Sequence, residues 1–145
     1  PKYNSSEEEY VDVEIPDVTG MSKSDAGIAI DESGLEVKFS GESDLIVDQI
    51  PKAHTRVTQG STVVLYTEGN KATRSVAVPN VVGKTPAEAN STLVSEGLNA
   101  KIKGVSKSGK NATCIGQSPV EGTMVEPGTV VSLNFRYDES ETTND

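Results

Sequence analysis

The chain has little of what most binding and catalytic sites are built from: no tryptophan, four tyrosines, two phenylalanines, one histidine and one cysteine. The single cysteine, Cys114, excludes an internal disulfide and is expected to be a small buried residue. The single histidine, His54, excludes a zinc site built on several histidines and leaves Cys114 as its one thiol partner. We expect His54 to be an exposed turn residue and the cores to consist of Val, Ile and Leu.

Long apolar runs are also missing, since no stretch approaches the roughly 20 residues that span a bilayer. The first residues, PKYNSSEEEY, are polar and unlike a signal peptide. We therefore expect a soluble chain that reaches a membrane only through an anchor outside this sequence. A formal net charge of −9 argues against nucleic acid as a partner.

Signatures of catalysis and cofactor binding are absent as well. The tripeptide Gly83-Lys84-Thr85 resembles the end of a phosphate-binding loop, but the glycine required five residues earlier is Val78. No Ser-x-x-Lys occurs, and the carboxylates are dispersed. The sequence thus predicts a noncatalytic chain without cofactor or metal.

What the chain does contain is a repeat. The stretch IPDVTGMSKSDAGIAIDESGL at 15–35 recurs as VPNVVGKTPAEANSTLVSEGL at 78–98, an offset of 63 residues. From Pro51 and Pro119 onward the offset is 68, so the second copy carries five additional residues, which fall near 104–111. Two homologous units are therefore expected.

Each copy predicts one helix with defined ends. Thr85-Pro86-Ala87-Glu88 forms a capping box with proline at the first helical position, so the second helix should begin at residue 86. Ser22 and Asp25 form a weaker version in the first copy, where Gly27 should also destabilise the helix by about 1 kcal/mol. Gly34 and Gly97 should end the two helices in the left-handed conformation.

Alternating apolar residues predict strands before and after each helix, at 11–15, 35–39, 45–49 and 61–67 and at their counterparts in the second copy. The predicted fold class is α+β, two tandem repeats, each with one helix on a small antiparallel sheet of about three strands. The predicted domains are a linker at 1–10, repeat 1 at 11–67, a linker at 68–73, repeat 2 at 74–136 and a disordered acidic tail at 137–145.

One cluster of charge is a candidate binding site. Residues 11–68 carry 4 basic and 11 acidic residues, whereas residues 74–136 carry 7 basic and 4 acidic. Four lysines gather on a predicted strand and the inserted loop: Lys101, Lys103, Lys107 and Lys110. Together with the open backbone of nearby glycines they could hold a carboxylate or phosphate of a polymer. A solvated loop is the alternative.

Several short motifs recur in the same order in both copies. They are IPDVTG and VPNVVG; Asp25-Ala26 and Glu88-Ala89; Gly34-Leu35 and Gly97-Leu98; and Gln-x-Pro followed by Val-x-x-Gly, at Gln49, Pro51, Val57 and Gly60 and at Gln117, Pro119, Val125 and Gly128. In this order they resemble PASTA domains, the repeats of penicillin-binding proteins and of the extracellular parts of bacterial serine/threonine kinases. His54 departs from the glycine usual in that turn, which the resemblance suggests is altered here.

The resemblance implies a noncatalytic module in the cell wall, on the extracellular face of the cytoplasmic membrane of a Gram-positive-type cell. The implied partners are peptidoglycan or a muropeptide, with a β-lactam as a further ligand class and the parent's own transpeptidase domain as a protein partner. No binding residues carry over, because the shared residues are structural.

Three functions stay open from the sequence. Two repeats close to the chain end favour the tail of a class B penicillin-binding transpeptidase, which the module would position on peptidoglycan. The first alternative is a spacer that packs on its own transpeptidase domain without a ligand. The second is a muropeptide-sensing ectodomain of a serine/threonine kinase.

Overall fold

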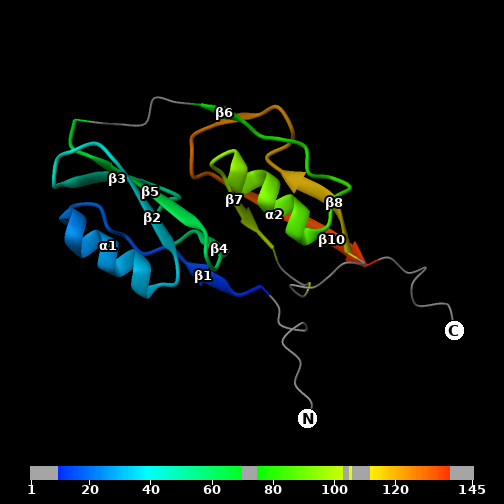
Figure 1. The fold of residues 1–145 in the computed structure, drawn as a ribbon, viewed down its shortest axis with the longest axis horizontal. Helices are drawn as coiled ribbons and strands as arrows, with labels where there is room; N and C mark the ends of the chain where they lie inside the picture. The colour runs from blue at the N-terminus through cyan, green and yellow to red at the C-terminus, as the bar shows by residue number, and fades with distance from the viewer. Residues whose placement is uncertain (1–9, 70–74, 103–104, 106–111, 138–145) are drawn as a thin grey trace, which may run out of the picture.

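The computed structural model describes residues 10–69, 75–102, 105 and 112–137 and contains two repeats of the same architecture (Figure 1). The first repeat comprises β1 (Asp12–Glu14), α1 (Lys23–Glu32), β2 (Glu36–Ser40), β3 (Ile46–Ile50), β4 (Arg56–Thr58) and β5 (Thr62–Thr67). The second comprises β6 (Val76–Ala77), α2 (Pro86–Ser95), β7 (Asn99–Lys101), β8 (Ala112–Ser118), β9 (Met124–Val125) and β10 (Val130–Tyr137). The predicted α+β class and the tandem repeat are confirmed.

The helix ends follow the sequence signals. α2 begins at Pro86, and its capping box is complete: the Thr85 hydroxyl accepts from the Glu88 amide, while the Glu88 carboxylate accepts from the Thr85 amide, each at 3.2 Å. In α1 the Ser22 hydroxyl accepts from the Asp25 amide at 3.2 Å. Glu88 is therefore a helix-cap residue, as predicted, whereas Asp25 contributes its backbone amide to the Ser22 cap and no capping box forms in α1, which the structure describes in full.

The three-stranded sheets are mixed, which corrects the prediction of an antiparallel sheet. In the first repeat the strand order is β2-β5-β3, with β2 parallel and β3 antiparallel to β5. The second repeat has the same arrangement, β7-β10-β8. The prediction paired consecutive strands as hairpins. In the structure the last strand, β5 or β10, lies at the centre of the sheet and runs parallel to β2 or β7.

Each sheet carries its helix on one face, and the core lies between them. Ala26 and Ile30 of α1 pack against Val63 and Leu65 of β5 in the first core. Ala89 and Leu93 of α2 occupy the same positions in the second core, together with Val131 and Leu133 of β10. A two-stranded ribbon, β1-β4 or β6-β9, completes each repeat.

Three of the four predicted domain boundaries lie within the described residues, and the fourth, at 73–74, lies outside them. Tyr10, assigned to a linker, packs against the core of the second repeat, and burial raises its pKa. The Glu68 amide donates to the Leu45 carbonyl at 2.9 Å, and Tyr137, assigned to the tail, is the last residue of β10.

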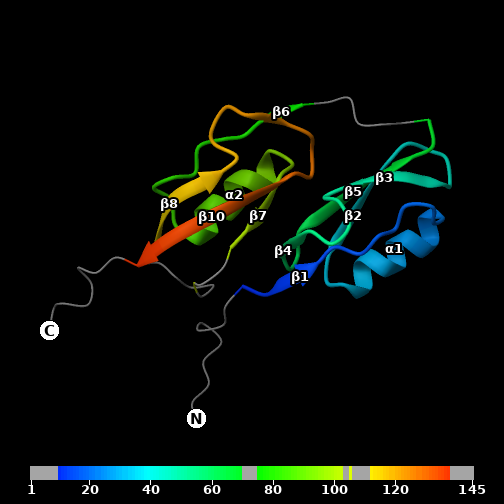
Figure 2. The ribbon, with the colours of Figure 1, turned by 180° about the vertical axis from the view of Figure 1, so that it is seen from behind.

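The repeats are in direct contact through what we call the repeat interface, formed by β4 and β5 of the first repeat and by β7 and the loop before β10 of the second. The Asn99 side chain accepts from the Thr62 amide at 2.8 Å and donates to the Thr62 carbonyl at 2.7 Å. The Ile102 amide donates to the Thr58 hydroxyl at 2.9 Å. Figures 1 and 2 show β4 lying beside β7 from opposite sides of the molecule.

Close backbone approach at one glycine tightens the repeat interface. A Cβ atom on Gly128 would lie 2.6 Å from the Ile50 carbonyl oxygen and 3.1 Å from a methyl carbon of Val64. Contacts below 3.0 Å essentially never occur for a real Cβ, so a side chain here would force the two repeats apart. The equivalent Gly60 of the first repeat has open space around it.

Candidate functional site

The motif residues shared by the two repeats have structural partners. The buried Gln49 side chain accepts from the Val18 amide at 2.9 Å and donates to the carbonyls of Pro16 at 2.9 Å and Pro51 at 3.2 Å. Gln117 makes the same three bonds in the second repeat, to Val81, Pro79 and Pro119 at 2.8, 3.0 and 3.1 Å. Each glutamine therefore fastens the entry to its helix to the edge strand of the sheet.

The two residues with nucleophile or base chemistry are held by separate contacts. Cys114 is fully buried on β8, where its thiol donates to the Gly116 carbonyl at 3.3 Å and burial raises its pKa. A buried thiol that keeps its proton is a poor nucleophile. His54 lies in the first repeat, with Nδ1 2.7 Å from a Glu14 carboxylate oxygen.

The turn at His54 keeps the conformation of its glycine counterpart. His54 has φ +72°, and the equivalent Gly122 has φ +88°. The His54 amide donates to the Ile15 carbonyl at 2.7 Å, and the Gly122 amide donates to the Val78 carbonyl at 2.8 Å. The expectation of an altered turn is therefore wrong, since the hydrogen bond to the entering strand imposes the left-handed conformation on either residue.

Backbone amides that could cradle a phosphate at Gly83-Lys84-Thr85 are already in use. The Gly83 amide donates to the Cys114 carbonyl at 2.8 Å, and the Lys84 amide donates to the Val81 carbonyl at 3.2 Å. The Thr85 amide is taken by the capping box. The structural interpretation of this tripeptide is thus the correct one. Among the described residues, no three His, Cys, Asp or Glu side chains gather as a metal site would require.

Of the predicted lysine cluster, Lys101 is described, whereas Lys103, Lys107 and Lys110 lie outside the described residues. Lys101 is half-buried at the end of β7 and is paired in register with Ser132 of β10. These two residues and Asn134 line a shallow hollow of about 310 Å³ on the sheet face opposite α2. We call it the β10 hollow.

Sequence reasoning did not include Ser132 and Asn134. A signal was available, because Ser132, Asn134 and Arg136 alternate with Val131, Leu133 and Phe135 along the strand. Such alternation places the polar set on the face away from the core. The β10 hollow therefore combines an ammonium group with a hydroxyl and an amide, a set that hydrogen-bonds carboxylates, amides and sugar hydroxyls.

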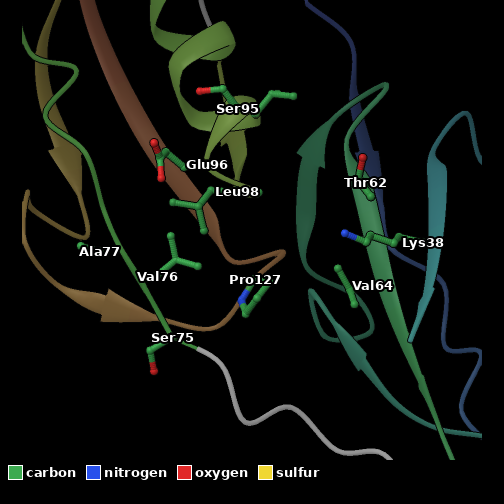
Figure 3. A pocket seen from close by; sticks show the side chains of 12 residues that line it. Lys38, Thr62, Val64, Ser75, Val76, Ala77, Ser95, Glu96, Leu98 and Pro127 are labelled. Atoms are coloured by element: carbon green, nitrogen blue, oxygen red, sulfur yellow. The ribbon is translucent and has the colours of Figure 1, made fainter. Parts of the chain in front are cut away.

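A larger cleft of about 630 Å³ lies between the repeats (Figure 3). Lys38, Thr62 and Val64 of the first repeat form one wall, and the opposite wall includes Glu96 and Leu98 of the second. Lys38 holds in the first repeat the position that Lys101 holds in the second, since each is the third residue of the strand paired in parallel with the central strand. The cleft between the repeats and the β10 hollow thus contain equivalent lysines, Lys38 and Lys101, in different surroundings.

Comparison with known proteins assigns the fold. The family model for the PASTA domain matches residues 13–69 and again residues 76–136. The chain belongs to the PASTA domain family. Both matched ranges coincide with the two repeats of the structure, and the PASTA domain is a noncatalytic module.

Among curated proteins, the chain is 35% identical over 125 residues to the serine/threonine-protein kinase PrkC of Bacillus subtilis, covering 80% of this chain and 19% of the kinase. It is 31% identical over 129 residues to the probable serine/threonine-protein kinase PknB of Corynebacterium glutamicum, covering 83% of this chain and 20% of the kinase. The chain thus spans about a fifth of the length of these relatives.

Among solved structures, penicillin binding protein 2X from Streptococcus thermophilus is similar at a TM-score of 0.38 and 15% identity, over 85% of this chain and 17% of that one. Within the described residues, no helix is long and apolar enough to cross a bilayer.

Proposed function

We propose that this PASTA pair is a noncatalytic module that attaches its parent enzyme to peptidoglycan on the extracellular face of the cytoplasmic membrane of a Gram-positive-type cell. The observation that carries the proposal is the β10 hollow, in which Lys101 lies beside the Ser132 and Asn134 side chains on an uncovered sheet face. Family membership supports the proposed cellular setting.

The chemistry of the β10 hollow favours the peptide part of the wall polymer. Peptide stems carry carboxylates and amides, which match an ammonium group, a hydroxyl and a side-chain amide. Sugar rings are usually gripped by exposed aromatic side chains, whereas the one aromatic residue that lines the hollow, Phe135, is partly buried and packs against the core of the second repeat. By sequence, Lys103, Lys107 and Lys110 follow Lys101 closely and would add positive charge beside the site.

Retention of the chain on purified sacculi tests this proposal. We expect Lys101→Ala to weaken retention several-fold, and Lys107→Ala with Lys110→Ala to weaken it further, with the salt dependence of exposed charges. The matched control is Lys38→Ala, which removes the equivalent lysine from the cleft between the repeats. Retention that is lost with Lys38→Ala and kept with Lys101→Ala would move the site to the cleft. No retention of the unmodified chain would contradict wall binding.

The parent enzyme is proposed to be a class B penicillin-binding transpeptidase, which the pair would position during cell-wall synthesis. The similarity to the PrkC kinase of Bacillus subtilis favours a second candidate, the muropeptide-sensing ectodomain of a serine/threonine kinase. Covalent labelling of the full-length parent by a fluorescent penicillin distinguishes them. A transpeptidase is labelled at its active-site serine, whereas a kinase incorporates phosphate from ATP and is not labelled.

A spacer function without ligand is the remaining alternative, in which the pair packs on the transpeptidase domain. Deleting residues 11–145 from the parent would then lower the melting temperature of the transpeptidase domain, whereas a wall-binding module leaves it unchanged. Titration of the chain with a β-lactam, followed by amide chemical shifts, examines the further ligand class. Shifts confined to the β10 hollow would assign both ligands to one site.

A further inference from the structure

The repeat interface has two different halves. The first repeat contributes Thr58, Thr62 and the outer sheet face around Val64, and the second contributes Asn99 and the backbone at Gly128. Because the repeats are homologous, each also carries the other half, at an outer end of the pair. A contact between unlike surfaces of equivalent units can continue indefinitely unless the outer ends prevent it.

At one outer end, Glu36 stands where the second repeat has Asn99. The two residues are equivalent because each is the first residue of the strand that runs parallel to the central strand of its sheet. Glu36 is paired in register with Thr62 of β5, and Asn99 is paired with Val130 of β10. The Asn99 amide group both accepts from an amide and donates to a carbonyl of the neighbouring strand. An ionised carboxylate can only accept, so Glu36 would leave the carbonyl of a docked strand unpaired and bury a charge.

At the other outer end, Glu126 stands where the first repeat has Thr58. Both residues accept the same turn hydrogen bond, from the Ser61 amide to the Thr58 carbonyl and from the Thr129 amide to the Glu126 carbonyl. Thr58 is 7% exposed within the repeat interface, whereas Glu126 is exposed. Docking of another repeat at this end would therefore remove a carboxylate from water.

The sheet faces opposite the helices, which we call the outer sheet faces, also differ between the repeats: the first is apolar and the second is polar. Ile50, Val64 and Tyr66 form a buried apolar cluster on the face opposite α1, next to the second repeat. The equivalent positions in the register of the second sheet are Ser118, Ser132 and Asn134, which are polar and exposed. The second repeat thus lacks the apolar surface on which a following repeat would rest.

From these substitutions we infer that the repeat interface is a docking surface for one partner, the other repeat of the same chain, and that Glu36 and Glu126 stop it from accepting a further repeat or a second copy. The pair is a closed unit of two. The two acidic residues determine this specificity, because each replaces a neutral side chain that hydrogen-bonds across the repeat interface.

Exchanging residues between equivalent positions tests the inference in the full chain. Asn99→Glu and Thr58→Glu each bring an outer acid into the repeat interface, and Asn99→Asp changes the amide to a carboxylate of the same shape. The reverse changes, Glu36→Asn and Glu126→Thr, bring the interface residues to the outer ends, where the inference predicts that together they allow a second copy to dock. Apart from Asn99→Asp, each substitution introduces a residue that already occurs at that position in the homologous repeat, so the fold of a single repeat accepts it.

The readout is the set of residual dipolar couplings of backbone amides. For the unmodified chain we expect one alignment tensor to fit both repeats, because the pair moves as one body. For Asn99→Glu, Asn99→Asp and Thr58→Glu we expect that single fit to be lost and each repeat to require its own tensor. One common tensor in any of these three variants, or two tensors in the unmodified chain, would overturn the inference.

For the double variant Glu36→Asn/Glu126→Thr we expect concentration-dependent association in sedimentation that the unmodified chain does not show. A double variant as monomeric as the unmodified chain would contradict the role of the two acids.

Discussion

The two repeats share a fold but differ in what the outer face of the sheet does. In the first repeat Val64 and Tyr66 are buried there, and Val64 lies close to Gly128 of the second repeat. In the second repeat Ser132 and Asn134 take these positions and line an open hollow beside Lys101. One position of the fold is therefore buried beside the other repeat in one copy and exposed in the other.

The difference teaches that the shared motif and the function occupy different residues. Helix caps, turn glycines and the buried glutamines fix the fold in both copies, so they are alike. Val64, Ser132 and Asn134 of the outer faces are not members of the buried cores beneath the helices, and these residues differ between the copies. Family membership alone would assign both repeats the same role, whereas we propose that one outer face docks the other repeat and that the other outer face binds a ligand.

Removing the amide side chains of Gln49 and Gln117 should lower the free energy of unfolding more than any other change considered. Comparing the two losses shows how far the repeats are equivalent. Gln49→Ala leaves two carbonyls and one amide without partners, and we expect a loss of about 3 kcal/mol in the first repeat. Gln117→Ala should cost slightly less, about 2 kcal/mol, because Gln117 is less buried. Amide hydrogen exchange resolves the two repeats separately. The exposed Gln59→Ala is the control, and an equal effect of Gln49→Ala and Gln59→Ala would contradict the role of the buried amide.

Exchanging the outer faces should break the comparison between the repeats. Val64→Ser introduces the residue of the second repeat into the buried face of the first, and we expect a loss of about 2 kcal/mol from lost apolar burial. The reverse change, Ser132→Val, alters an exposed position and should stay within about 0.5 kcal/mol. Urea unfolding of the full chain measures both. Equal costs would mean that the two faces have the same environment.

A smaller difference in stability is expected between the two helices, because α1 contains a glycine that α2 lacks. Gly27 lies within α1 at the position of Asn90 in α2, and a Cβ there would meet the Phe39 ring at an ordinary 3.6 Å. Gly27→Ala should therefore stabilise the first repeat by about 0.7 kcal/mol, since the helix gains propensity without a clash. The rise in thermal midpoint measures it, with Gly20→Ala, at φ +88°, as a destabilising control. Destabilisation by Gly27→Ala would show that the space is not available.

The smallest effect concerns the helix caps. Glu88→Ala and Asp25→Ala each remove a carboxylate from the first turn of a helix, but Glu88 also accepts from the Thr85 amide. The cost of Glu88→Ala should exceed that of Asp25→Ala by about 0.5 kcal/mol, the lower end of measured capping effects. Hydrogen exchange in the first turns of α1 and α2 reports the difference. Equal protection losses would indicate that the box contributes nothing beyond charge.

Much of the fold could be predicted because its signals are local. The capping box at Thr85 and the glycine at Gly97 determine the ends of α2 whatever surrounds the helix. The mixed sheet could not be deduced this way, since strand order depends on which strand is buried on both faces. A signal existed in Val63–Tyr66, a run of four buried apolar residues typical of a central strand covered on both sides.

The candidate site was only partly predictable for a related reason. Lysine enrichment pointed to the second repeat and to Lys101, but the partners Ser132 and Asn134 come from a strand about 30 residues later. The contact of Asn99 with the other repeat could not be predicted from the sequence, because a single asparagine at the start of a strand forms no periodic pattern. Its meaning depends on Thr62, a residue of the other repeat.

Solvent accessibility of the two outer faces tests the central claim most directly. With a soluble gadolinium chelate as paramagnetic probe, the methyl signals of Val64, which is 6% exposed, and of Ile50 should be weakly attenuated. The side-chain amide of Asn134, which is exposed, should be strongly attenuated in the same sample. Attenuation of Val64 and Ile50 as strong as that of Asn134 would contradict the assignment of one face to docking and the other to ligand binding.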